Sequence, residues 1–251
     1  AYVDITTGEF AATELNGSDV QSLLRAELAR LRPAEILHPE GLALPNGLPG
    51  HTTPWQGWRF EFSRSEQELR RHFGVTSLDG FGLRGMVSAV RAAGAIIQYL
   101  TESQPAALKL LSSLATYEIS AFMTLDAATR RNLELTETIR TGSMRGSLMG
   151  ELERAVTPMG KRLLGQWVSK PLLDVSHINQ RQDGVTFFFT RGMLRAELRA
   201  AMKPLNDLER LAMRVAGGTA QPRDLLAMRQ TLARLDGIAR LLQEEGLPIG
   251  D

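Results

Sequence analysis

The pattern of hydrophobic residues changes once along the chain, and this change limits the possible folds more than any other feature. Through residues 1–104, short alternating or aromatic-rich runs take turns with helical patterns, which is typical of helices packed against a sheet. Beyond Pro105 the pattern is helical, apart from one extended segment at Tyr117–Met123. We therefore predict an α/β domain over residues 1–104 and a mainly helical domain over residues 105–251.

The expected elements follow from periodicity, proline and glycine positions, and capping residues. A run that is already alternating at Ala1 fits a chain taken from a longer protein. The expected strands are Ala1–Ile5, Phe10–Leu15, Glu35–His38 and Trp55–Phe62, with a loop over residues 39–54. The expected helices are Val20–Leu31, Ser63–Phe73, Met86–Gln104, Ser147–Glu153, Pro158–Ser169, Ser176–Phe189, Leu194–Met202, Asp207–Val215 and Arg223–Leu242.

Composition excludes several classes of protein. The chain has 251 residues, 43% of them hydrophobic, which is enough for two cores. It has no cysteine and no apolar run long enough to span a membrane, so we expect a cytoplasmic protein without a membrane partner. The net charge of +1 divides into about −3 for residues 1–104 and +4 for residues 105–251. This imbalance is too small for a dedicated nucleic-acid surface.

The stretch Met123–Leu135 joins the two regions and predicts a short capped helix. Asp126 is a suitable N-cap, and Arg130 follows four residues later on the same helical face. Glu134 lies four residues beyond Arg130, so we predict that Arg130 is structural and is held between these two carboxylates. Arg131 points about 100° away, and would touch phosphate only if both arginines faced solvent. The predicted structural junction is Asp126, Arg130, Arg131, Asn132 and Glu134.

Signals for catalysis are weak. A metal-dependent nuclease needs carboxylates that converge from neighbouring strands, and Asp4, Glu9, Glu35 and Asp79 do not have that spacing. No glycine-rich phosphate loop is present, so we expect no catalytic, cofactor-binding or metal-binding residue. Trp167 is expected in the core because apolar residues share its helix. The four histidines are expected on surfaces or loops, and these are His38, His51, His72 and His177.

Several motifs occur in one order along the chain. Leu-Asp-Ala-Ala-Thr-Arg-Arg-Asn-Leu-Glu-Leu ends at Leu135. With its flanking motifs it resembles the connector and core domains of the MutS family of DNA mismatch-recognition proteins. Two positions depart mildly from the family pattern: Glu153 stands where Asp is expected and Ala155 where Thr is expected. The other motifs are Tyr2–Phe10, Ser77–Leu83, Ala92–Leu100, Val156–Gly160, Arg162–Leu164, Trp167, Pro171–Leu173, Ile178–Arg181 and Asp207–Leu211.

The resemblance implies a specific architecture and role. It implies an α/β connector domain with an RNase-H-like layout and an all-α helical-bundle core domain, with Arg223–Leu242 as the start of a lever helix. These domains would relay ATP-driven conformational change between an ATPase and a DNA clamp, and the connector would help to recruit MutL. The full-length parent would use ATP and Mg, bind mismatched duplex DNA and pair with a second MutS subunit, whereas this fragment would catalyse nothing.

An alternative of a different class is an independent helical DNA-binding or regulatory module with an α/β sensor domain. The flanking gene sequence distinguishes the two hypotheses. A downstream Gly-x-x-x-x-Gly-Lys-Ser/Thr element would favour the MutS reading, because its glycine-rich loop and lysine bind nucleotide phosphates.

Overall fold

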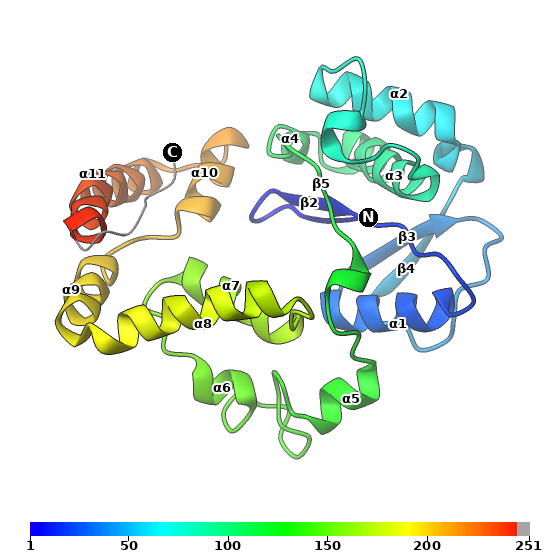
Figure 1. Ribbon diagram of the computed structural model, residues 1–251. Coiled ribbons are helices and arrows are strands. Elements are labelled where there is room, and N and C mark those ends of the chain that lie inside the picture. Colours follow the sequence, from blue (N-terminus) through cyan, green and yellow to red (C-terminus); the bar gives the residue numbers. More distant parts are fainter. Residues whose placement is uncertain (245–251) are drawn as a thin grey trace. The chain divides into compact units, whose positions relative to one another are not determined.

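The computed structural model describes residues 1–244 and forms two compact units (Figure 1). The first unit runs from Ala1 to Leu133, and the second begins at Glu134. Strands and helices alternate in the first unit, whereas the described part of the second is built from helices, so the expected change from α/β to helical structure is confirmed. The expected boundary at residues 104 and 105 falls inside the first unit, and as a limit of independent folding it stays a prediction.

Two small sheets lie in the first unit. In one sheet, β2 (Glu9–Ala12) is central, antiparallel to β1 (Tyr2–Asp4) and parallel to β5 (Ala115–Thr116). In the other, β3 (Glu35–Pro39) pairs in parallel with β4 (His51–Trp55). The first sheet therefore places β2 beside the segment that leads toward the junction.

The second sheet corrects one prediction. The strand expected over Trp55–Phe62 is wrong, because β4 ends at Trp55 and Gly57–Phe60 forms the 3-10 helix η1. Part of the expected loop is instead β4, which gains a ladder with β3 that no local pattern reveals. Pro54 is tolerated in this strand because a two-stranded sheet leaves one edge of each strand without a hydrogen-bonding neighbour.

The helices of the first unit agree with the prediction in three main cases and differ in the smaller ones. The expected extended segment at Tyr117–Met123 contains the 3-10 helix η3, and α4 was not expected. The helical elements besides η1 are α1 (Val20–Leu31), α2 (Phe62–Phe73), η2 (Asp79–Phe81), α3 (Val87–Ser103), α4 (Pro105–Leu108), η3 (Ile119–Ala121) and α5 (Ala127–Asn132).

The core of the first unit lies between β2 and the pair α2 and α3, which run side by side (Figure 1). Phe10 and Ala12 of β2 belong to this core, whereas Ala11 points to the opposite face and is also buried. Both faces of β2 are therefore covered. The other buried members of the core are Leu69, Leu78, Leu83, Ala89, Val90, Ala93, Ile97, Leu100, Leu111 and Leu114.

Four helices in the described part of the second unit begin after a residue whose side chain caps them. The side-chain oxygens of Ser147, Thr157, Asp174 and Asp207 each accept a hydrogen bond from a backbone N–H three residues later. Such a cap satisfies an N–H group that has no partner within the helix. The helices are α6 (Leu148–Leu152), α7 (Pro158–Ser169), α8 (Val175–Thr190), α9 (Gly192–Met202), α10 (Leu208–Ala216) and α11 (Pro222–Glu244).

Buried leucines of the second unit concentrate on α9 and α10, which both contact α11. Leu194, Leu198 and Leu211 are at most 6% exposed, whereas Leu225 of α11 is 52% exposed. Apolar side chains thus remain uncovered along part of the long helix. No helix within residues 1–244 has the length and apolar content needed to cross a membrane.

Candidate functional site

The junction contains the capped helix that the sequence predicts. Asp126 precedes α5, and its Oδ1 accepts a hydrogen bond from the Thr129 N–H at 2.6 Å. This hydrogen bond also holds the pKa of the Asp126 carboxyl below its usual range. The predicted N-cap is confirmed, because the spacing of cap and third helical residue is a local property of the sequence.

Arg130 lies differently from the prediction. Its Nε donates to the carbonyl of Leu125 at 3.1 Å, and its side chain is partly buried. Burial, together with the positive charge of Arg30 on α1, lowers the pKa of Arg130, and the charge of Glu27 opposes this effect. Arg130 therefore belongs to a polar environment that includes α1, which α5 contacts.

The expectation that Arg130 and Glu134 lie on one helical face is wrong. Helix α5 ends at Asn132, and Glu134 takes a left-handed φ of 47°, so the two residues do not share a helical face. The Glu134 Oε1 accepts from the Ile139 N–H at 2.6 Å. Arg131 and Asn132 are exposed on the surface of α5. A structural role for these five residues stays a prediction.

A polar cluster that joins α1 to the segment after β5 is not predicted from the sequence. The Tyr117 Oη donates to Glu27 Oε1 at 2.7 Å, and Arg30 Nε donates to Glu27 Oε2 at 2.9 Å. Although burial alone would lower it, the hydrogen bond with Glu27 raises the pKa of Arg30. Burial and the bond to Glu27 raise the pKa of Tyr117. Glu27 thus connects α1 to the segment that follows β5.

Tyr2 extends this cluster into β1. Its ring meets the ring of Tyr117 edge to face, with centroids 6.0 Å apart. Its Oη donates to Glu9 on the paired strand, and burial plus this bond raise the pKa of Tyr2. Only the Glu27 and Arg30 spacing on one helical face hinted at the cluster, since Tyr117 lies far away in sequence.

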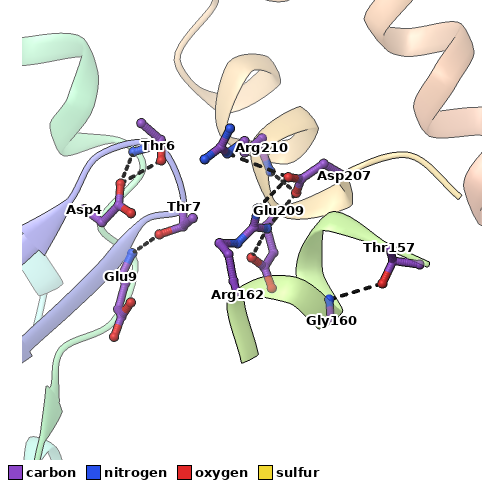
Figure 2. A network of polar contacts seen from close by, with 10 residues as sticks. All are labelled: Asp4, Thr6, Thr7, Glu9, Thr157, Gly160, Arg162, Asp207, Glu209 and Arg210. Atoms are coloured by element: carbon purple, nitrogen blue, oxygen red, sulfur yellow. Dashed lines mark hydrogen bonds and ion pairs between the residues drawn. The ribbon is translucent and has the colours of Figure 1, made fainter. Parts of the chain in front are cut away.

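The second unit has an ionic centre that joins α7 to the start of α10 (Figure 2). Arg162 holds both carboxylate oxygens of Asp207, at 2.6 and 2.8 Å, and also pairs with Glu209. The bond to Asp207 raises the pKa of Arg162, and the same bond lowers the pKa of Asp207. Asp207 also caps α10. Two motifs that are far apart in sequence are therefore fixed against each other.

The first half of helix α11 is held by polar contacts with α10 and with the residues before α10. Asp224 is buried and pairs with Arg214 of α10 at 3.2 Å. Thr231 is fully buried, and its Oγ1 accepts from the Asn206 N–H at 3.0 Å. These contacts fix the first half of α11 against α10 and against the connection that leads into α10.

Of the acidic residues considered for a nuclease, Asp4 and Glu9 lie opposite each other on the paired strands β1 and β2, whereas the other two lie on different elements of the first unit. Asp4 on β1 accepts hydrogen bonds from Thr6, as in a turn (Figure 2), while Glu35 on β3 of the other sheet accepts from Tyr99. Asp79 lies in η2. Within residues 1–244, no group of three histidine, cysteine or acidic residues is arranged to hold a metal ion.

The histidines and Trp167 have identifiable surroundings. His38 and His51 lie on β3 and β4, His72 contacts the carbonyl of Leu111 at 2.7 Å, and His177 lies 3.3 Å from Asp174. The expectation that Trp167 is a core residue is wrong, since its side chain is 39% exposed.

Trp167 lies in an open apolar groove instead. The ring is covered by the guanidinium of Arg181, 4.2 Å from its centroid, and Leu172, Val185 and Phe188 also line the groove. Helical periodicity shows that a residue belongs to an apolar face, but it does not show whether another element covers that face.

Two family models match the chain. The model described as MutS domain II matches residues 1–112, and the model described as MutS domain III matches residues 128–249. Between them they leave only residues 113–127, which lead into the junction, and the last two residues unmatched.

Curated relatives agree with these matches, and each is described as DNA mismatch repair protein MutS. The relative from Symbiobacterium thermophilum is 43% identical over 251 residues, covering 97% of this chain and 29% of the relative. Those from Synechococcus elongatus and Alkaliphilus metalliredigens are 39% and 37% identical, covering 99% and 97% of this chain and 30% and 29% of the relatives. The chain therefore belongs to the MutS family and spans less than a third of the length of these relatives.

Replacing Arg130 by alanine tests its structural role in the junction. We expect Arg130→Ala to lower the free energy of unfolding by about 2 kcal/mol, because it removes a partly buried cation and its bond to Leu125. Arg131→Ala, at an exposed position on the same helix, is the matched control and should stay within about 0.5 kcal/mol of wild type. Urea unfolding measures both, and equal effects would contradict a special role for Arg130.

Proposed function

We propose that this chain is the connector and core segment of a MutS-type mismatch-recognition protein. In this role it relays ATP-driven conformational change between the ATPase and the DNA clamp, and its connector helps to recruit MutL. The observation that carries the proposal is the division into two compact units, the first of which contains the whole match with MutS domain II and the second most of the match with MutS domain III. A relay needs packed elements that keep their own shape while their arrangement changes.

The architecture supports the mechanical part of this proposal. In the connector, the mixed sheet with α2 and α3 packed on it suits the proposed RNase-H-like layout. In the core, α11 suits the start of a lever, because it is 23 residues long and is fixed in its first half by Asp224 and Thr231. A long helix held at one end carries a displacement to the other.

The chemistry of the proposed protein belongs to the full-length parent. The parent would hydrolyse ATP with Mg, bind mismatched duplex DNA, pair with a second MutS subunit and act in the cytoplasm. The present chain would catalyse nothing itself.

We expect the purified chain to lack ATPase activity and to prefer mismatched over matched duplex by less than about tenfold, or 1.4 kcal/mol. Filter binding at low and high salt measures the preference for mismatched duplex, and a preference above about tenfold would contradict the assignment.

Competition tests the recruitment part of the proposal. The purified chain should compete with the full-length parent for MutL on mismatched DNA, since it carries the proposed MutL-binding domain. The readout is MutL retained on end-blocked mismatched duplex as the chain is titrated in. Failure to compete at concentrations well above that of the parent would contradict a MutL site within residues 1–251.

An insertion tests the relay. Two glycines added after Gly218 in the full-length parent lengthen the connection between α10 and α11, while two glycines added after Gly47 in the loop before β4 are the matched control. Both glycines already have positive φ and leave open space at their Cβ positions. We expect the first insertion to slow ATP-induced release from a mismatch at least about tenfold, with ATP binding unchanged. Equal release rates for the two insertions would contradict the relay.

A further inference from the structure

The junction helix is anchored to the first unit up to its last residue. Leu133 closes α5 by donating its N–H to the carbonyl of Thr129 at 2.9 Å. One turn earlier, Arg130 donates to the carbonyl of Leu125, and Leu125 is only 8% exposed. The charges of Glu27 and Arg30 on α1 act on Arg130, and α1 contacts α5. The chain through the N–H of Leu133 is therefore held by elements of the first unit.

The next residue is anchored to the second unit. The carbonyl of Glu134 accepts from the Leu148 N–H at 3.0 Å, and its side chain accepts from the Ile139 N–H at 2.6 Å. Leu135 continues this attachment, because its carbonyl accepts from the Met149 N–H at 2.8 Å and its side chain is 8% exposed. Backbone and side chain of Glu134 are thus both fixed by residues that follow it.

Three soft backbone torsions separate these anchors, namely φ and ψ of Leu133 and φ of Glu134. The side chain of Leu133 is 56% exposed, so packing does not restrain it. Glu134 has φ of 47°, a left-handed conformation that is unfavourable for an L-residue other than glycine, asparagine or aspartate. A residue kept in this conformation by its neighbours is a position where a small change in those neighbours alters the chain direction.

We propose that the Leu133–Glu134 linkage is the pivot between the two units and that α5 moves as part of the first unit. The change from mixed to helical sequence at Pro105 is then not the mechanical boundary, since α4 and the buried Leu111 pack in the first unit. This inference stands on backbone anchors and does not depend on MutL recruitment or on an ATP-driven relay.

Spin labels test the pivot directly. The chain has no cysteine, so cysteines introduced at the exposed positions Gln67 on α2 and Arg234 on α11 give one label in each unit. Double electron–electron resonance on the 251-residue chain then gives the distribution of distances between the labels, without DNA, ATP or MutL. Circular dichroism confirms that each variant is folded.

Glycine at the pivot should broaden this distribution. We expect Glu134→Gly to increase its width at least about twofold, because glycine takes φ of either sign. Glu134→Gln is the matched control that keeps an L-residue and an acceptor for the Ile139 N–H, and its width should equal that of wild type. Pro105→Gly, at the boundary expected from the sequence, should also leave the width unchanged.

A second variant protects the test against misfolding. Leu133→Gly changes an exposed side chain and should broaden the distribution even if Glu134→Gly does not fold. Broadening by either glycine at the pivot, with none at Pro105, supports the proposal. The proposal is overturned if Pro105→Gly broadens the distribution, or if both pivot variants keep the wild-type width.

Discussion

Replacing Gly94 by alanine should destabilise the first unit by about 2–3 kcal/mol, even though alanine is the better helix former. Gly94 lies on α3 where this helix meets α2. An added Cβ would come within 2.3 Å of the Ser65 Cβ and 2.4 Å of its Cα. Ser65 is fully buried, so the two helices would have to separate and expose the core between them.

The predicted clash involves the backbone of Ser65 and not only its side chain. Truncating the neighbour, as in Gly94→Ala combined with Ser65→Gly, should not restore stability, because the Cα of residue 65 remains in the way. Gly237→Ala is the matched control, since Gly237 is also helical but nothing lies within 4 Å of its Cβ position. This control should stabilise the chain by up to about 1 kcal/mol.

Tryptophan fluorescence can assign the effect to the first unit. Two of the three tryptophans, Trp55 and Trp58, lie in that unit, so a Trp167→Phe background reports its unfolding alone. We expect the urea midpoint of this signal to fall in Gly94→Ala and to stay unchanged in Gly237→Ala. An unchanged midpoint in Gly94→Ala would show that α2 and α3 are not packed this closely.

Features set by nearby residues are those that the sequence predicts well. The cap at Asp126 and the helices that begin after Thr157 and Asp207 need only a side-chain oxygen and an N–H three residues later. The end of α5 was less predictable, because the left-handed turn at Glu134 has no glycine or asparagine to mark it. Helical spacing therefore predicts a helix through Glu134, although α5 ends at Asn132.

Contacts between distant segments explain most of what the sequence does not predict. Strand β4 is defined by its ladder with β3, and Glu27 meets Tyr117 because β5 returns beside β2. The structure also shows the surroundings of one residue that departs from the family pattern. Glu153, where aspartate was expected, pairs with Lys161 through Oε2, while its Oε1 is buried without a hydrogen-bond partner in the described chain.

The second large effect should come from Arg162, whose bonds with Asp207 and Glu209 join α7 to α10. We expect Arg162→Met to lower the free energy of unfolding of the second unit by about 2 kcal/mol at neutral pH. The aliphatic part of the side chain is kept, but the Asp207 side chain, 16% exposed, loses its bidentate partner. This estimate lies below the value for a fully buried pair because Arg162 remains 25% exposed.

The pH dependence gives this prediction its sign. The bond from Arg162 lowers the pKa of Asp207 in the folded state, so the stabilisation is complete above the ordinary aspartate pKa of about 4. It is lost as the pH falls through the lowered folded-state pKa. The difference between wild type and Arg162→Met should therefore be constant from about pH 6 to 8 and shrink below about pH 4.

Arg210 supplies the control within the same ionic centre. Its Nε lies 3.7 Å from the Asp207 carboxylate, and its side chain is 55% exposed, so Arg210→Met should change the free energy of unfolding by less than about 0.5 kcal/mol. Urea unfolding monitored by Trp167 in a Trp55→Phe, Trp58→Phe background measures both variants in the second unit. If the two variants have equal effects, or if the Arg162 effect persists unchanged at about pH 3, the bidentate pair does not hold α7 against α10.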